Sequence, residues 1–402
     1  MHFGIRKANL FRLLVISLLL SLLAISGLGA SSPADSAADP PASQQSLPAA
    51  EKNLTYNDSA LFIAGLSHRQ GALSALEDKP AWQKYARFIS QSWERFDDRH
   101  LAPMREWASQ ELPKAHTSTV FYPFSGPDFV NMYTLFPHAK TYLMIALEPA
   151  GEMPDLATID DNRFFADLQH SLYDLLQLKF FITDKLSNSL KKSEVKGILP
   201  ILLFFLAREK TQVLDVRYWV MKPDGTVAES PATGPRQLSS QDIAGVRLDF
   251  APVGSQEKQT LYYFRFNLRD DSWRRHEKFV SFLKGFGPLT TFAKAASYLM
   301  HKPHYSGIRQ FVLGQSVYVL QGDSAIPLKY FDRTTWNLRF FGTYSHPINY
   351  FKKFQQKDLA EIYQKDTDVY PLPFGIDYYH RVKTSNLMFA AKRAELAVNP
   401  SK

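Results

Sequence analysis

Cysteine is absent from the 402-residue sequence. This absence excludes disulfide bonds, thiol nucleophiles, zinc sites built on cysteine and lipid attachment through a cysteine. The chain is nevertheless long enough to bury a large hydrophobic core without covalent cross-links.

The sequence has a single hydrophobic run of membrane-spanning length, over 13–30, and it follows a short basic segment. Small and polar residues come next, which is the pattern of a secretory signal. We therefore predict a signal peptide over 1–32 or, as the alternative, an uncleaved anchor. Either would place the body in the periplasm or outside the cell. The next longest apolar run, over 198–207, is too short to span a bilayer, so we expect membrane contact only through the N-terminal segment.

Charge of one sign is not concentrated in any part of the sequence. The formal net charge is +8, from 47 basic and 39 acidic residues, and no long block of Lys or Arg occurs. A dispersed excess of this kind favours anionic surfaces at long range. We expect an anionic envelope component or a protein as partner, and no nucleic acid, because no nucleic-acid-binding motif accompanies the charge.

The composition divides the remaining chain into a linker and one body. Ala, Ser and Pro dominate the start of 33–58, which predicts a disordered linker. We expect a single α/β domain over 59–402 that begins with helices over 59–111. Within those helices, apolar residues recur at three- and four-residue steps, which predicts one face packed on a core. These residues are Trp82, Tyr85, Ile89, Trp93 and Phe96.

Strand-like and helix-like segments alternate through the body, which favours an α/β fold. We predict a Rossmann-like mixed sheet flanked by helices and preceded by the N-terminal helical segment. Strands are expected over 116–122, 142–147, 213–221, 246–250, 261–268, 317–320, 336–341 and 387–391. Helices are expected over 128–136, 198–207, 290–300, 307–313 and 348–363.

The stretch Ser125-Gly126-Pro127-Asp128 lies where a strand is expected to turn into a helix, and Glu148 follows the next expected strand. A nucleoside site at such a turn uses glycine for close backbone approach and an acidic residue after the second strand for the ribose hydroxyls. Only one glycine is present, and Pro127 has no N–H to offer a phosphate. We predict Gly126, Asp128 and Glu148 as ligand-binding residues.

This layout, over about 117–151, resembles the first strand-helix-strand unit of the methyltransferase-type Rossmann-like fold. The resemblance implies a site for S-adenosylmethionine. Such cofactors are held in the cytosol, whereas the body is expected outside it. We therefore expect an inherited scaffold and no resident cofactor.

A second resemblance covers most of the body and rests on short blocks of sequence. These are YPFSGPD at 122–128, ALEPAG at 146–151, SYLMH at 297–301, LQGDSAIPLKYF at 320–331, FFGTYSHPI at 340–348 and LPFGIDY at 372–378. Together they resemble a group of exported bacterial proteins of unassigned activity. The resemblance implies export and no particular chemistry.

Three further side-chain types have functional groups suited to chemistry. His301 and His304 have a spacing that suits a metal ion, but Pro303 interrupts a helix there and no third ligand is marked, so we expect surface residues and no metal. Asp323, in a turn after an expected strand, is either a general base, a ligand for a hydroxyl-rich substrate, or a residue that hydrogen-bonds its own backbone. Ser125 is a weak nucleophile candidate because SGPD is not the GxSxG elbow.

Two classes of function therefore remain. One is a non-catalytic binding or structural module on a degenerate Rossmann-like scaffold, which we favour because no reaction motif is complete. The other is an exported hydrolase that uses carboxylates near Asp128, Glu148 and Asp323. An enzyme should gather these side chains in one cavity, whereas a scaffold would scatter them.

Overall fold

The computed structural model describes most of the chain beyond residue 53. The described residues are 54–67, 73–112, 117–156, 158–159, 161–176, 195–232, 238–365, 368–378 and 380–394. The expected signal peptide or anchor and most of the expected linker lie outside them. No helix in these ranges is long and apolar enough to cross a membrane.

The expected N-terminal helical segment is present and begins slightly earlier than predicted. The first helix starts at Tyr56, where Thr55 and Asp58 form a reciprocal capping box. The apolar stripe expected within this segment faces the interior, with Trp82 and Ile89 both buried. The segment comprises α1 (Tyr56–Ile63), α2 (Ser74–Glu77), α3 (Pro80–Phe96), a π-helical turn (Asp97–Leu101) and α4 (Ala102–Glu111).

The centre of the protein is an 11-stranded mixed sheet, which confirms the α/β class. Its order is β10-β9-β11-β8-β7-β1-β2-β6-β5-β3-β4. The run β8-β7-β1-β2-β6 is parallel; β5, β3 and β4 extend one side antiparallel, and β11 is antiparallel to both β8 and β9. The strands are β1 (Thr119–Pro123), β2 (Thr141–Ala146), β3 (Thr211–Met221), β4 (Val227–Pro231), β5 (Ile243–Pro252), β6 (Gln259–Arg265), β7 (Leu289–Ala293), β8 (Ser316–Gln321), β9 (Trp336–Gly342), β10 (Val369–Tyr370) and β11 (Asn386–Lys392).

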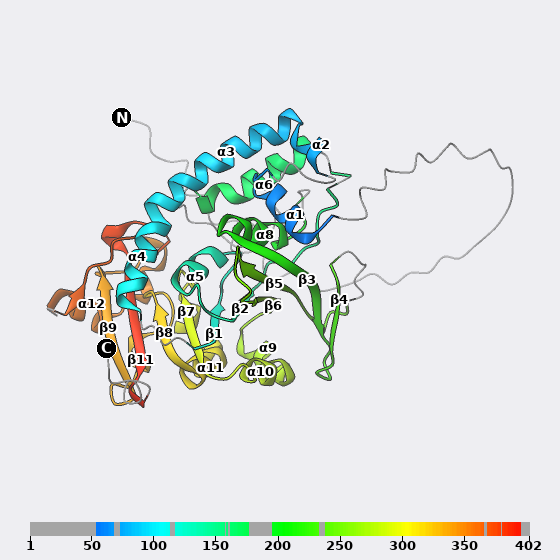
Figure 1. Cartoon of the computed structure of the whole chain (residues 1–402). Helices are drawn as coiled ribbons and strands as arrows, with labels where there is room; N and C mark the ends of the chain where they lie inside the picture. Colours follow the sequence, from blue (N-terminus) through cyan, green and yellow to red (C-terminus); the bar gives the residue numbers. More distant parts are fainter. Residues whose placement is uncertain are drawn as a thin grey trace, which may run out of the picture. The chain divides into compact units, whose positions relative to one another are not determined.

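Helices cover both faces of the sheet (Figure 1). Alternate residues of a strand point to opposite faces, so Val120 and Tyr122 join one hydrophobic cluster while Phe121 joins the other. The first cluster lies against α1, α3, α4, α5 (Phe129–Leu135), α6 (Asp161–Leu176) and α8 (Leu199–Arg208). The second lies against α9 (Asp270–Arg275), α10 (Glu277–Lys284), α11 (Ser306–Gln315) and α12 (Lys357–Lys365). Short 3₁₀ turns cover Leu299–His301, Pro303–Tyr305, Leu328–Tyr330, Asn349–Phe354 and Val382–Thr384.

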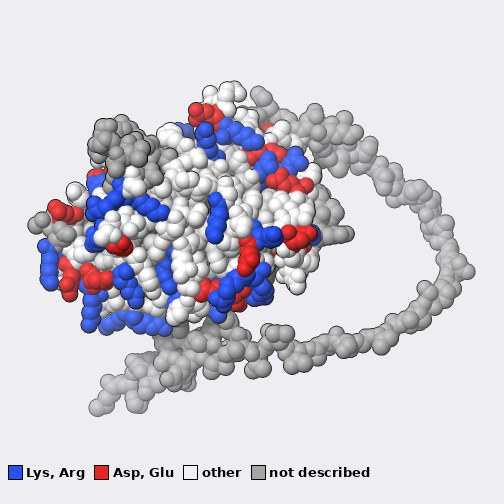
Figure 2. Space-filling model, turned by 90° about the horizontal axis from the view of Figure 1, so that it is seen from below, with Lys and Arg blue, Asp and Glu red and all other residues white. Residues whose placement is uncertain are grey.

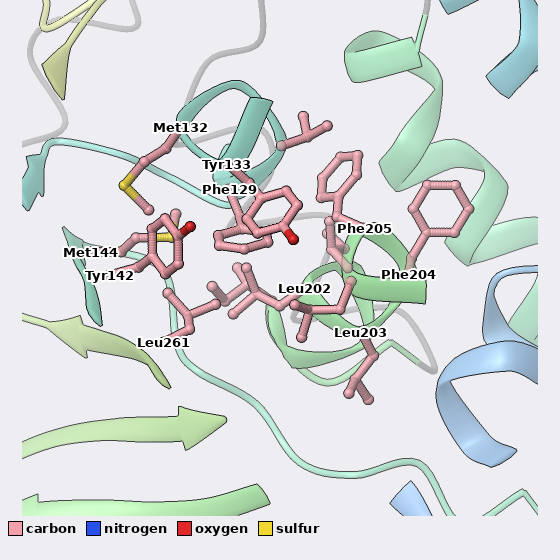
Figure 3. Close-up of a cluster of buried hydrophobic side chains, with 14 of the residues drawn as sticks. Phe129, Met132, Tyr133, Tyr142, Met144, Leu202, Leu203, Phe204, Phe205 and Leu261 are labelled. Atoms are coloured by element: carbon pink, nitrogen blue, oxygen red, sulfur yellow. The ribbon is translucent and has the colours of Figure 1, made fainter. Parts of the chain in front are cut away.

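The aromatic packing between α5, α8 and the sheet holds the first strand-helix-strand unit in place (Figure 3). Phe129 of α5 has its ring centroid 5.5 Å from that of Tyr142 on β2 and 5.9 Å from that of Phe250 on β5. Every residue of α5 is buried. A helix that is buried on all sides is held by the core and not by exposed pairs along its surface. The loop before α5 is therefore anchored on a rigid base.

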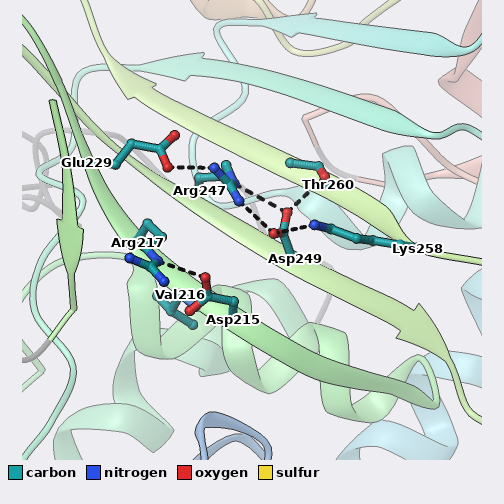
Figure 4. Close-up of polar contacts among 8 residues, drawn as sticks. All are labelled: Asp215, Val216, Arg217, Glu229, Arg247, Asp249, Lys258 and Thr260. Carbon is teal, nitrogen blue, oxygen red and sulfur yellow. Dashed lines mark hydrogen bonds and ion pairs between the residues drawn. The ribbon is translucent and has the colours of Figure 1, made fainter. Parts of the chain in front are cut away.

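Ion pairs cover one surface of the antiparallel strands β3–β6 (Figure 4). Asp249 accepts from Arg247 at 2.8 Å and lies 2.8 Å from the Lys258 ammonium, and Arg247 also pairs with Glu229. Burial alone would raise the pKa of Asp249, but hydrogen bonds from Arg247, Lys258 and Thr260 outweigh it and hold the pKa below its ordinary value. Of these residues, Glu229 lies on the edge strand β4, where a charged side chain discourages pairing with another sheet.

Two expected helices are corrected by the structure. The helix expected over 290–300 is wrong: β7 occupies Leu289–Ala293 and a loop follows. All five residues of β7 are buried, and a short strand buried on both faces has no period that separates it from a buried helix. The helix expected over 348–363 is broken, since a 3₁₀ turn ends at Phe354 and α12 starts at Lys357.

Candidate functional site

A cavity of about 330 Å³ opens at the carboxyl ends of the parallel strands, and we call it the first cavity. Its walls come from the segments that follow β1, β2, β6 and β7, and from the loop before β11. The chain passes from β1 to β2 on one side and later places β7 on the other side of β1, so the strand order reverses here. Open α/β sheets bind ligands at this kind of position.

A buried ion pair crosses the reversal point. Asp128, just after β1, lies 2.7 Å from the ammonium of Lys294, just after β7, and their side chains are only 5% and 8% exposed. The Asp128 carboxylate also accepts from the Tyr122 hydroxyl at 3.0 Å and from the Asn131 amide at 2.6 Å. Asp128 stands at the start of α5, but its side chain makes no capping hydrogen bond. Its carboxylate is therefore directed at the cavity walls and not at the helix backbone.

A histidine buried in the helical layer continues this network. His100 lies in the π-helical turn between α3 and α4, and its Nε2 is 2.8 Å from Asn131 Oδ1. Because the amide nitrogen of Asn131 donates to Asp128, its oxygen must accept, so His100 carries its proton on Nε2. Burial and, to a smaller extent, the nearby Lys294 charge lower the pKa of His100 to about 3, although the hydrogen bond with Asn131 acts in the opposite direction. We call Asp128, Lys294, Tyr122, Asn131 and His100 the Asp128 cluster.

Glu148 lies on the same cavity, two residues beyond the end of β2, and is fully buried. The hydroxyl of Tyr263, on β6, donates to its main-chain carbonyl at 2.7 Å. The loop beyond it is tied to the start of α8 by the Ile198 N–H, which donates to the Pro149 carbonyl at 3.1 Å. The carboxylate is thus placed at the carboxyl end of the strand beside β1, where a ribose-binding acid was expected.

Several residues with left-handed backbone lie around the first cavity. Phe124, Ala295, Ser297 and His380 all line the first cavity, and all have positive φ angles between 47° and 60°. Non-glycine residues rarely adopt this region, at a cost of about 1–3 kcal/mol each, and those that do gather at binding and catalytic sites. Burial and the neighbouring Lys294 charge also keep the pKa of the His380 imidazole well below its ordinary value.

A second cavity, of about 460 Å³, adjoins the first, and Asp377 and Tyr378 line both. Asp323 belongs to this second cavity and not to the first. Its carboxylate accepts from the Tyr298 hydroxyl and, at 3.0 Å, from the Asn386 amide. Burial raises the pKa of Asp323 above its ordinary value.

The structure therefore brings some predicted residues together and separates others. Ser125, Gly126, Asp128 and Glu148 share the first cavity, whereas Asp323 lines its neighbour. Within the described residues, the Ser125 hydroxyl hydrogen-bonds only to main-chain carbonyls, those of Gly126 and Ile145.

The two histidines considered for metal binding are placed differently. His301 is half-buried, with Nε2 3.2 Å from the Asp323 carbonyl, and burial lowers its pKa to about 4. His304 is exposed on a 3₁₀ turn. No group of three or more His, Asp or Glu side chains suited to a metal ion occurs in the described part of the chain.

Four members of the Asp128 cluster were not predicted from the sequence: Lys294, His100, Asn131 and Tyr122. Lys294 was hidden because its strand was read as part of a helix. A closer reading of the β-branched pair Thr290-Thr291 could have indicated a strand end there. His100 and Asn131 carry no motif, since each reaches the site only through helix packing.

No protein-family model, curated protein or solved structure matches this chain. Function is therefore inferred from the geometry of the two cavities.

Proposed function

We propose that the protein is a binding module that takes a nucleoside-type ligand in the first cavity of a Rossmann-like scaffold. The observation that carries this proposal is the position of the cavity. It opens where the strand order reverses, between β1 and β7, with Glu148 at the end of the adjoining β2. Crevices at this point of doubly wound sheets bind nucleotides.

The strand order supports the Rossmann-like assignment. Numbered in chain order, the five parallel strands β1, β2, β6, β7 and β8 follow the spatial order third-second-first-fourth-fifth. This is the order of the first five strands in dinucleotide-binding sheets. Beyond these five strands, β11 lies between β8 and β9 and is antiparallel to both.

The wall chemistry favours a nucleoside that carries no phosphate against α5. Pro127 has no N–H, and α5 has only seven residues, so a phosphate cradle is missing from the loop after β1. Glu148 suits a ribose diol. Asp128 and Lys294 together offer one charge of each sign, which suits a zwitterionic amino-acid tail. An adenosyl compound with such a tail, as in S-adenosylhomocysteine, has all of these groups.

Export remains our proposal for the place of action, with an anionic envelope component or a protein as further partner. Because the body is expected outside the cytosol, we propose a nucleoside encountered there and not a resident cofactor. Lys and Arg side chains are dispersed among Asp and Glu over the face seen from below (Figure 2). This pattern supports weak attraction to anionic surfaces more than a dedicated basic groove.

The alternative hydrolase has less support. It would use Asp128, Glu148 and Asp323 together, but Asp323 lines the other cavity.

Thermal unfolding of the full-length chain in the presence of S-adenosylhomocysteine, adenosine, ATP and methionine tests the proposal. Ligand at about 100 times its dissociation constant stabilises by about 2.7 kcal/mol, or about 4 °C for a body of this size. We expect this increase in Tm with S-adenosylhomocysteine, a smaller one with adenosine and none with ATP.

The matched variants are Glu148→Gln, which keeps the shape and removes the charge, and Glu257→Gln, an exposed position that lines neither cavity. Glu148→Gln should abolish the ligand-induced increase, and Glu257→Gln should retain it. An unchanged Tm with every nucleoside would reject the proposal, as would an increase that survives in Glu148→Gln.

A further inference from the structure

The second cavity has a polar lining that the nucleoside proposal does not use. It lies beyond the carboxyl end of β8, between the segment after β9 and the loop before β11. Hydroxyl, amide and cationic side chains form most of its wall. They include Thr343, Asn349, Arg381, Lys383 and Asn386. At about 460 Å³ it has the size of a small-molecule site.

One wall of the second cavity is rigid and pre-organised. Tyr298, Phe351 and Tyr378 form a separate buried aromatic cluster, with the Phe351 ring 5.0 Å from Tyr298 and 5.3 Å from Tyr378. The Tyr378 hydroxyl accepts from the Ser297 N–H at 2.7 Å. Tyr298 itself is held in left-handed backbone at φ 54°. Strain that the surroundings enforce is typical of a binding surface.

The two carboxylates of the cavity are oriented by protein donors. Asp323 accepts from Tyr298 and from Asn386, and the Asn386 carboxamide oxygen accepts the Asp323 N–H at 2.9 Å. Asp377 accepts from the Thr384 hydroxyl at 3.0 Å and from the Arg381 N–H at 3.3 Å. A carboxylate fixed in this way retains lone pairs that can accept from a ligand hydroxyl.

The cations occupy the outer part of the same wall. The side chains of Arg381 and Lys383 are exposed and come from the loop before β11, on the 3₁₀ turn Val382–Thr384 and just before it. The cavity therefore combines hydroxyl-accepting groups inside with positive charge at its mouth. Guanidinium and ammonium groups bind carboxylate and phosphate oxygens with charge-assisted hydrogen bonds.

We propose that the second cavity binds a small hydroxylated anion of monosaccharide size, such as a sugar acid. Its hydroxyl groups donate to Asp323 and exchange hydrogen bonds with Asn349 and Thr343, and its negative group faces Lys383 and Arg381. The proposal is independent of the nucleoside site, because none of these residues lines the first cavity.

Isothermal titration calorimetry on the full-length chain tests this site, with glucuronate as the probe. Glucose lacks the charge and acetate lacks the hydroxyl groups, so both should bind at least tenfold more weakly than glucuronate. Loss of one charged contact that contributes about 1.4 kcal/mol raises Kd tenfold. We therefore expect Lys383→Met to weaken glucuronate binding about tenfold and Asp323→Asn to weaken it by a similar factor.

Lys357→Met is the matched control, because Lys357 is an exposed lysine that lines neither cavity. It should leave the affinity for glucuronate unchanged. Lys383 is exposed, so its variant is expected to fold, and its Tm confirms this independently of ligand.

A dimer of glucuronate extends the test. Tighter binding of the dimer than of the monomer would identify the natural ligand as the end of an acidic glycan, and equal binding would identify a free sugar acid. Absence of glucuronate binding at a Kd below about 1 mM, equal binding of glucose, or an unchanged affinity in Lys383→Met would each overturn the proposal.

Discussion

At the scale of single residues, Asp128 is the point where three separate elements meet. Its carboxylate accepts from Tyr122 on β1, from Asn131 on α5 and from Lys294 after β7. An ion pair of this kind is not by itself a strong source of stability, because both charges lose their hydration. Removal of one partner, however, leaves the other charged and buried.

Lys294→Met should therefore destabilise the protein by about 3–5 kcal/mol, because Asp128 would remain buried without its cation. Urea unfolding measures the loss. The double variant Lys294→Met/Asp128→Asn removes both charges and should recover part of it. A loss below about 1 kcal/mol in the single variant would mean that the pair is not buried in solution as it is here.

The sequence indicated some residues of the first cavity and omitted its cation. Gly126, Asp128 and Glu148, which line the cavity, could be named as candidates because a strand-turn-helix unit leaves a local pattern. Lys294 is distant in the sequence from Asp128, and the two side chains meet only because β7 pairs with β1. Contacts that depend on strand pairing across the sheet leave no local pattern.

At the scale of elements, the helical segment expected over 59–111 contains a turn that is not α-helical. A π-helical turn covers Asp97–Leu101 between α3 and α4. Wide turns of this kind insert a residue into the helix and are frequent at functional sites. Here the turn contains His100, which is directed inward onto Asn131. The regular apolar stripe of α3 gave no indication of it.

The close crossing of two loops sets the position of the chain beyond Glu148. Gly151 and Gly197 approach so closely that a Cβ added to Gly197 would lie 2.4 Å from the Gly151 Cα. Both have positive φ angles, of 85° and 93°. This crossing allows the segment before α8 to pair with the loop after β2, where Glu152 N–H donates to the Lys196 carbonyl at 2.9 Å.

Gly197→Ala should destabilise the protein more than Gly254→Ala. Gly254 also has a positive φ, of 83°, but open space surrounds its added Cβ. Gly254→Ala thus measures the left-handed backbone cost alone, about 1–2 kcal/mol. Because of the additional clash, the loss of unfolding free energy in Gly197→Ala should exceed that in Gly254→Ala by about 1–3 kcal/mol, measured by denaturant unfolding. Equal losses in the two variants would show that the loops separate without cost.

At the scale of the whole molecule, buried histidines should make stability depend on pH. His100 has an ordinary pKa near 6.5 when unfolded and about 3 when folded, so the unfolded state binds more protons between these values. Its contribution is fully present above pH 6.5 and is lost as the pH falls toward 3. Glu209, whose pKa burial raises to about 7, acts in the opposite direction.

A comparison of variants isolates the contribution of His100 to the pH dependence of stability. Between pH 6 and pH 4, the unfolding free energy of the unaltered chain should fall more steeply than that of His100→Gln, by up to about 1.4 kcal/mol per pH unit. His138→Gln, at an exposed histidine, should keep the original slope. If His100→Gln also keeps that slope, His100 is protonated within the folded protein.

The sequence by itself determined the α/β class, the N-terminal helical segment and the residues at the first strand-to-helix turn, because each of these follows from local composition and periodicity. It also carries the prediction of export in residues that the structure does not describe. Only the tertiary structure decided that Lys294 pairs with Asp128, that His100 reaches the same network, and that Asp323 belongs to a neighbouring cavity. These relations depend on the order of strands across the sheet, which is set by packing between residues far apart in the chain.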